Sequence, residues 1–206
     1  MIDTQVLKAD APQAIPRALQ VLGDGGVVAL PTDTVYGIGV LASLGASVEK
    51  LYAIKGRDST KAIPVLIGDM ADLEAVAPQP SPGALALAEA FWPGPLTLVL
   101  RRRPELPPQL SEGDTIGVRV PDHPAARALL QAAGPMGVTS ANLSGGADTH
   151  SAEEVLAQLR GRIDLVLDGG RTPGSVPSTV VDVGGEAPVI LRPGPITEAQ
   201  ISAILA

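Results

Sequence analysis

Small polar side chains and glycines gather in two short segments that each follow a run of apolar residues. The segments are 31–37 (PTDTVYG) and 138–146 (VTSANLSGG). Hydroxyls and amides can bind phosphate oxygens or a ribose, and glycines allow a ligand to approach the backbone closely. Both segments therefore favour a pocket for a polar small molecule. The alternative interpretation is an ordinary polar turn.

Cationic side chains form a second group of candidates. Lys55 and Arg57 flank a glycine at the expected end of a helix, and Lys61 follows. A guanidinium beside an ammonium suits a polyphosphate or a carboxylate, but charge at a helix C-terminus with a glycine stop explains the same residues. Arg119 lies inside an apolar strand and Arg192 at the end of the last expected strand. An unpaired charge is costly there, so an anionic ligand, solvent or a structural ion pair is expected.

Hydrophobic periodicity and glycine or proline turns predict the elements that position these residues. Helices are expected at 11–22, from about 48 to 55, and at 70–76, 83–91, 124–132, 151–159 and 198–205. Strands are expected at 27–30, 63–67, 97–100, 115–120, 136–140, 165–167, 179–183 and 189–191. The alternation predicts an α/β fold, and the closely spaced strands near the C-terminus predict a partly antiparallel sheet. We expect one domain over 1–206, with the last helix covering an edge or face of the sheet.

Composition excludes several classes of protein. The chain has 206 residues with 15 Lys+Arg and 22 Asp+Glu, a formal charge of −7, which argues against non-specific binding to nucleic acids or anionic membranes. It has no cysteine and only two histidines, which excludes thiolate chemistry and nearly excludes histidine-based zinc and triad sites. No apolar run suits a signal peptide or a membrane span, so a cytoplasmic protein is expected.

Seven segments in collinear order resemble the YrdC/Sua5 family of threonylcarbamoyl-AMP synthases. They are PTDTVYG (31–37), KGR (55–57), FWPGPLT (91–97), GVRVPDHP (117–124), TSANLSG (139–145), PSTVVD (177–182) and LRPG (191–194). The resemblance implies a twisted mixed α/β sheet with flanking helices around a basic concave cavity, in the short single-domain form. It also implies synthesis of threonylcarbamoyl-AMP and pyrophosphate from L-threonine, bicarbonate and ATP, for the modification of adenosine 37 in tRNA.

The resemblance further implies site residues. The KxR and SxN signatures place catalytic residues at Lys55, Arg57, Ser140 and Asn142. Threonine contacts match Thr34, Arg119, Thr139 and Ser178. ATP contacts match Arg57, Lys61, Thr115, Ser140, Ala141, Asn142, Thr149 and Arg192. Two positions depart from the family pattern: Asp58 replaces a common proline, and Leu66 replaces a common histidine that helps to hold threonine. Mg²⁺ is expected with ATP, held by phosphate oxygens and water.

This chemistry needs little acid–base equipment. The threonine amine would attack bicarbonate or its activated form, and the carbamate oxygen would displace pyrophosphate at the α-phosphate. Five cations expected in one cleft would aid both steps: Lys55, Arg57, Lys61, Arg119 and Arg192. One rival is carbamoyl transfer from carbamoyl phosphate. Another is an RNA-binding or ribosome-maturation factor, ranked last because the chain is acidic and has only four aromatic residues.

The product is expected to pass to a separate tRNA threonylcarbamoyl transferase, with direct handover as one route. Direct tRNA binding is expected to be weak or absent.

Overall fold

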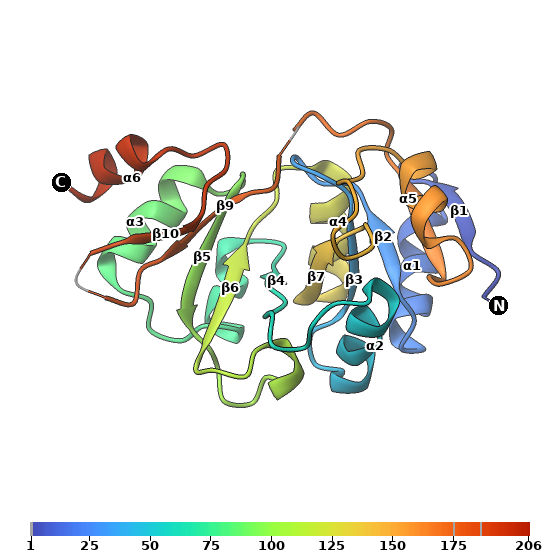
Figure 1. The fold of residues 1–206 in the computed structure, drawn as a ribbon, viewed down its shortest axis with the longest axis horizontal. Coiled ribbons are helices and arrows are strands. Elements are labelled where there is room, and N and C mark those ends of the chain that lie inside the picture. Colours follow the sequence, from blue (N-terminus) through green and yellow to red (C-terminus); the bar gives the residue numbers. More distant parts are fainter. Residues whose placement is uncertain (1, 175, 186) are drawn as a thin grey trace.

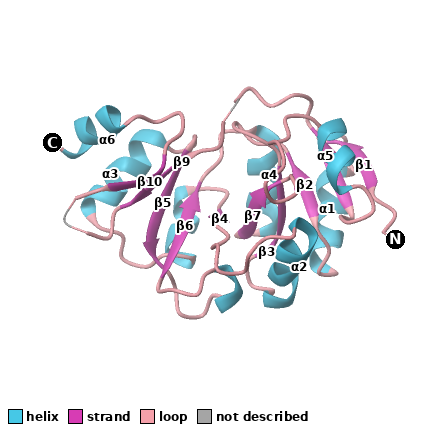
Figure 2. Cartoon of the chain, in the orientation of Figure 1, coloured by secondary structure: helices cyan, strands magenta, loops and turns pink. Residues whose placement is uncertain are grey.

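The computed structural model describes residues 2–174, 176–185 and 187–206, and these form an α/β fold around one ten-stranded sheet (Figures 1 and 2). The strands in sheet order are β1 (Gln5–Lys8), β8 (Leu165–Asp168), β2 (Val28–Leu30), β3 (Gly37–Leu41), β7 (Met136–Ser140), β4 (Val65–Leu66), β6 (Thr115–Arg119), β5 (Leu96–Arg101), β9 (Thr179–Asp182) and β10 (Val189–Arg192). The helices are α1 (Ala14–Gly23), α2 (Gly45–Lys55), α3 (Pro82–Phe91), α4 (Pro124–Ala133), α5 (Ala152–Leu159) and α6 (Glu198–Leu205). Two short 3₁₀ helices, η1 (Met70–Ala75) and η2 (Pro108–Leu110), complete the elements.

The sheet is mixed, as the sequence predicts. Strand β8 pairs in parallel with β1 and β2, and β6 and β5 pair in parallel with β4 and β9 respectively. The other neighbours are antiparallel, including β9 and β10 near the C-terminus. In Figure 1 the short β4 lies between one group of strands that carries α1, α2, α4 and α5 and another that carries α3 and α6.

Alternating side chains bury both faces of the first group of strands. In β2, Val28 and Leu30 pack with α1 and α4, while Ala29 belongs to a second cluster that includes residues of α2 and α5. Strand β5 places Leu96, Leu98 and Leu100 in that second cluster. Its other face, with Thr97 and Val99, lines a cavity. The period of two along these strands thus separates the core from the functional surface.

Some expected elements differ in the structure. Strands β1 and β3 were not predicted, the helix expected at 70–76 is 3₁₀, and the strand expected at 63–67 pairs only at 65–66. Helix α6 packs on α3, and its Ile201 joins the apolar cluster that includes Leu96 and Val181 of the sheet. The helices of the described residues are all too short or too polar to cross a membrane.

Candidate active site

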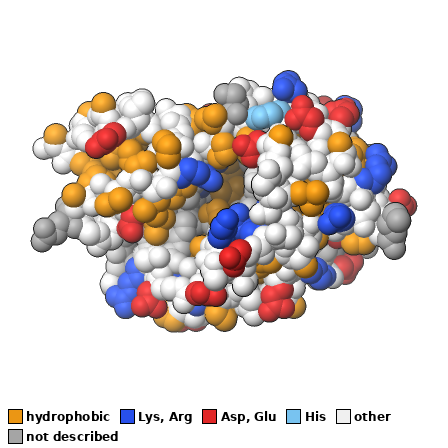
Figure 3. Space-filling view, viewed as in Figure 1, with side chains coloured by type: hydrophobic (Ala, Val, Ile, Leu, Met, Phe, Trp, Pro, Cys, Tyr) orange, Lys and Arg blue, Asp and Glu red, His pale blue; other side chains and the backbone are white. Residues whose placement is uncertain are grey.

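A cavity of about 380 Å³ lies between the two groups of strands. Its walls come from the segment after β2, from β3 and β7 on one side, and from β5, β6 and β9 on the other. Figure 3 shows this hollow, with Lys and Arg side chains at both of its rims. Among the described residues that line it are three arginines, Arg57, Arg119 and Arg192, and no Asp or Glu.

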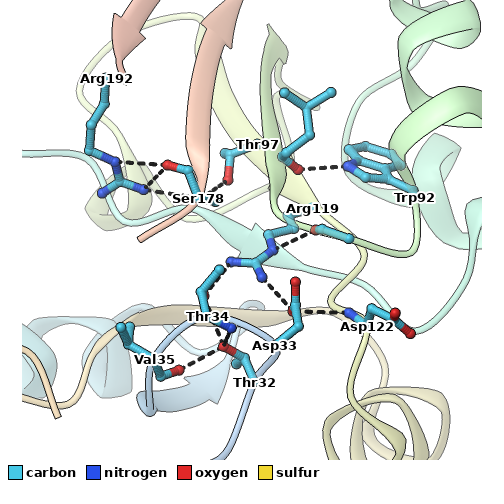
Figure 4. A network of polar contacts seen from close by, with 12 residues as sticks. Thr32, Asp33, Thr34, Val35, Trp92, Thr97, Arg119, Asp122, Ser178 and Arg192 are labelled. Atoms are coloured by element: carbon cyan, nitrogen blue, oxygen red, sulfur yellow. Dashed lines mark hydrogen bonds and ion pairs between the residues drawn. The ribbon is translucent and has the colours of Figure 1, made fainter. Parts of the chain in front are cut away.

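Arg119, at the end of β6, is held in place from three directions (Figure 4). Its Nε donates to the carbonyl of Gly94 at 2.9 Å, one terminal nitrogen donates to Thr34 Oγ1 at 3.1 Å, and the other pairs with Asp33 Oδ1. The same Asp33 oxygen accepts the Asp122 N–H at 3.0 Å. Burial lowers the pKa of Arg119 and Asp33 opposes that effect, so the guanidinium keeps its charge at the cavity wall.

Arg192 and Ser178 form a second polar group across the cavity. Arg192 donates twice to the Ser178 carbonyl, at 3.1 and 2.9 Å, and once to its hydroxyl at 3.1 Å. The Ser178 and Thr97 hydroxyls lie 2.8 Å apart. Figure 4 shows Ser178 and Thr97 on the same side of Arg119 as Arg192, with Thr34 and Asp33 on the other. A ligand in this space meets two guanidinium groups and several hydroxyls.

Lys55 lies beneath the cavity rather than on its surface. Its ammonium donates to the carbonyl oxygens of Ser140 and Asn142 and to Asn142 Oδ1 at 3.0 Å, with Ser140 Oγ at 3.4 Å. Burial, followed by the charge of Arg57, lowers the pKa of Lys55 to about 8. An ammonium has three hydrogens, so these contacts already use its donors. Lys55 therefore fixes the turn that follows β7.

The rest of the KxR segment faces the cavity more openly. Arg57 lines the cavity, and its guanidinium donates to the carbonyls of Lys61 and Ala62 at 3.3 and 3.2 Å. Asp58, which could have neutralised Arg57, instead accepts from the amide and hydroxyl of Thr60 at 3.0 and 2.9 Å. The Lys61 side chain is exposed and does not belong to the lining.

The structure brings eight of the thirteen residues implied by the resemblance to the cavity lining: Thr34, Arg57, Thr115, Arg119, Thr139, Ser140, Ser178 and Arg192. The other five lie outside that lining. Ala141, Asn142 and Thr149 are buried, Lys55 is buried beneath the turn, and Lys61 is exposed. Thr149 donates to the Ala141 carbonyl at 3.2 Å, so it supports the same turn as Lys55. The expectation that five cations share one cleft is therefore reduced to three at its surface.

Several residues of the site were not predicted from the sequence. Asp33 carries the charge that pairs with Arg119, and Thr32 and Thr97 supply further hydroxyls to the wall. The signal for Asp33 was its place between two threonines in the 31–37 segment. Leu66, which stands at the position of the family's histidine, lines the cavity as an apolar contact.

A protein-held metal is not supported by the arrangement of side chains. The described residues contain no group of three or more His, Cys, Asp or Glu that could hold an ion.

Comparisons with known proteins agree with this fold. The Sua5_yciO_yrdC family model, described as "Telomere recombination", matches residues 20–194. The threonylcarbamoyl-AMP synthase of Bacillus subtilis is 42% identical over 98% of this chain and 59% of its own length. The chain thus spans about three fifths of that relative.

Two solved structures are similar over nearly the whole chain. The crystal structure of P. abyssi Sua5 complexed with L-threonine has a TM-score of 0.92 at 35% identity, covering 100% of this chain and 61% of that one. The crystal structure of E. coli YciO has a TM-score of 0.85 at 30% identity, covering 98% and 100%. On the family match and these similarities together, the chain belongs to the Sua5/YciO/YrdC family.

Proposed function

We propose that this protein is a threonylcarbamoyl-AMP synthase, which joins L-threonine, bicarbonate and ATP and releases pyrophosphate. The observation that carries the proposal is the shared cavity, in which Arg119 and Thr34 lie opposite Arg192 and Ser178. The similarity to a Sua5 structure that contains L-threonine supports it.

The threonine would bind at Arg119. A guanidinium can bind a carboxylate through two parallel hydrogen bonds, and three of its five N–H donors are used by Gly94, Thr34 and Asp33. Two donors are thus left for the carboxylate. Thr34, Thr139 and Ser178 supply hydroxyls around this position, and Leu66 supplies an apolar surface for the methyl group.

The triphosphate would bind toward Arg57 and Arg192. These arginines and the hydroxyls of Ser140 and Thr115 line the same cavity, whose described lining contains no carboxylate. Such a surface attracts polyanions even in a chain with a formal charge of −7. Lys55, Asn142 and Thr149 would shape the turn that presents Ser140, and Lys61 would assist from the exterior. We propose that Mg²⁺ arrives with ATP.

The reaction then needs orientation and charge stabilisation more than acid–base groups. The amine nitrogen attacks the bicarbonate carbon, water leaves, and the resulting carbamate oxygen forms a bond to the α-phosphorus as the bond to pyrophosphate breaks. Arg57 and Arg192 would stabilise the charge that develops on the phosphate oxygens. Arg119 would hold the threonine at the correct distance.

Pyrophosphate release tests this function. The purified chain is incubated with ATP and Mg²⁺, and threonine and bicarbonate are each omitted in turn. Release that requires both substrates supports the proposal. Release that requires added carbamoyl phosphate in place of threonine and bicarbonate would favour carbamoyl transfer, and no release from folded protein would favour a binding role.

The fate of the product is also a proposal. A carbamoyl adenylate is a mixed anhydride that water hydrolyses, so a separate transferase would use it promptly to modify tRNA in the cytoplasm. We propose that the chain acts as one domain and binds tRNA weakly or not at all, because its net charge is negative.

A further inference from the structure

The hydroxyls of Thr32 and Thr34 form a short hydrogen-bonded series in the cavity wall (Figure 4). At both ends of this series it is fixed which group donates and which accepts. At one end, Thr32 Oγ1 lies 2.6 Å from the carbonyl oxygen of Val35, which can only accept, so Thr32 is the donor. At the other end, Arg119 lies 3.1 Å from Thr34 Oγ1, and a guanidinium can only donate.

These two end contacts determine the direction of the hydrogen bond between the Thr32 and Thr34 hydroxyls. The two hydroxyl oxygens lie 3.0 Å apart, and Thr32 also accepts the backbone N–H of Thr34 at 3.1 Å. Because the single hydrogen of Thr32 goes to Val35, the hydrogen between the two oxygens must belong to Thr34. The other orientation would place two oxygens against each other without a hydrogen, inside a buried wall.

Thr34 therefore has no hydrogen left for a ligand. It donates to Thr32 and accepts from Arg119, which leaves one lone pair on the hydroxyl oxygen of a residue that lines the cavity. Seen from the cavity, Thr34 is only an acceptor. A carboxylate oxygen cannot bind to it, whereas an N–H or O–H can.

We infer that Thr34 recognises a hydrogen-bond donor of the amino-acid substrate, and that Thr32 is a positioning residue which keeps Thr34 in this acceptor state. The inference rests on the proposed function. L-Threonine offers two such donors, its amine and its hydroxyl, while its carboxylate offers none. Because Thr34 can only accept a hydrogen bond, the carboxylate of the substrate is directed to Arg119. An oxygen that only accepts also cannot protonate the attacking amine.

Binding measurements with Thr32→Val test the inference. Valine has the shape of threonine but cannot accept the hydrogen of Thr34, whose hydroxyl is then free to turn its hydrogen toward the ligand. We expect the Kd for L-threonine, measured by calorimetry, to rise about tenfold, the effect of one lost hydrogen bond. Thr32→Ser keeps the hydroxyl and is expected to bind like the wild type.

Two analogues identify the donor. L-2-Aminobutyrate lacks the hydroxyl of threonine and 3-hydroxybutyrate lacks the amine, while both keep the carboxylate. Thr32→Val should weaken the binding of L-threonine and of the analogue that retains the group bound at Thr34. It should not weaken the binding of the other analogue. If the wild type fails to bind one analogue, the group which that analogue lacks is required for binding. The effect of Thr32→Val is then compared between L-threonine and the other analogue.

Equal losses for all three ligands, or no loss for any, would overturn the inference. Failure of the wild type to bind L-threonine would overturn the proposed function as well, and it is seen without any variant. Neutron diffraction of the wild type provides a test that needs no variant to fold. A Thr34 hydroxyl deuterium directed at Thr32 supports the inference, and one directed into the cavity overturns it.

Discussion

Asp33 and Arg119 form a buried ion pair in the cavity wall, joining the segment after β2 to the end of β6. The side chains are only 10% and 6% exposed respectively. The second oxygen of Asp33 is buried and has no partner among the described residues, so Arg119 and the Asp122 amide balance this carboxylate. The pair therefore fixes Arg119 and connects the two groups of strands that enclose the cavity.

Asp33→Asn should destabilise the fold and weaken threonine binding together. The amide keeps the shape of the carboxylate but leaves the buried guanidinium without its counter-charge, a loss of about 3 kcal/mol in the free energy of unfolding. Urea unfolding and calorimetry with L-threonine measure the two effects. Lys8→Met, which breaks the exposed Lys8–Asp168 pair, is the control and should change little. Wild-type stability and affinity in Asp33→Asn would contradict this role.

Arg57→Ala should abolish adenylate formation and leave the fold intact. Arg57 lines the cavity, and within the described part of the chain its guanidinium donates hydrogen bonds only to two backbone carbonyls, which solvent can satisfy after its removal. Turnover and the thermal melting curve are measured side by side. Arg101→Ala removes an exposed arginine from the end of β5 outside the cavity lining and should keep full activity. Normal turnover in Arg57→Ala would remove Arg57 from the mechanism.

Lys55 should lose its proton near pH 8. Burial and the charge of Arg57 lower its pKa to about 8 from the 10.5 of an ordinary lysine. Between these pH values the unfolded chain binds more protons than the folded one, so this group makes the free energy of unfolding rise with pH, relative to Lys55→Met. Carbon-13 NMR of the lysine side chains measures the midpoint. Lys8, whose pKa is raised mainly by its hydrogen bond to Asp168, is the internal control. A Lys55 midpoint near 10.5 would contradict the effect of burial on this ammonium.

Both tyrosines should ionise at a higher pH than a free phenol does. The chain has only two tyrosines, and burial raises the pKa of Tyr36 to about 12 and also raises that of Tyr52. The Tyr36 hydroxyl donates to the Gly170 carbonyl at 2.7 Å and accepts the Gly169 N–H at 3.1 Å. Absorbance at the tyrosinate band should therefore be far below half of its final value at about pH 10. A half-complete titration at that pH would show that the phenols are open to water.

Gly174→Ala should disturb threonine binding through the backbone. A Cβ at Gly174 would lie 2.5 Å from the Asp33 carbonyl oxygen and 2.7 Å from Thr34 Cα, which are backbone atoms that cannot move alone. We expect a loss of about 1–3 kcal/mol in stability and a weaker affinity for L-threonine. Gly113→Ala is the matched control, because nothing lies within 4 Å of its added Cβ. Equal behaviour of the two variants would contradict the close approach at Gly174.

Local patterns predicted most elements, and the exceptions have physical causes. The run Val27–Leu30 ends at Pro31 and forms β2 as expected. Strand β3 was missed because Gly37 and Gly39 interrupt its apolar pattern. Both glycines are required because Val138 packs against them. A Cβ at Gly37 would lie 2.6 Å from Val138 Cγ1, and a Cβ at Gly39 would lie 2.9 Å from Val138 Cγ2. Strand β1 was missed because three of its four residues are exposed, so no buried face marks its sequence.

In the site, too, local sequence predicted which residues are candidates, whereas their partners lie far away in the sequence. An apolar strand with a single arginine predicted that Arg119 faces an anionic partner or solvent. The structure shows an anionic partner, Asp33, 86 residues away in the chain. Its place between two threonines marks Asp33 as a polar candidate, but only the tertiary structure shows which of the 22 acids pairs with Arg119. Lys55 was expected at the ligand, but its partners at 140–142 lie on a neighbouring turn that only the tertiary structure brings beneath it.

The most direct test of the central claim is the mass of the nucleotide formed from ATP, L-threonine and carbon-13 bicarbonate. If threonine and phosphate react within this one cavity, the product is an adenylate that carries threonine and a single carbon-13 atom, and its formation is lost in Arg57→Ala. Only unmodified ATP, ADP or AMP from folded, threonine-binding protein would contradict the account.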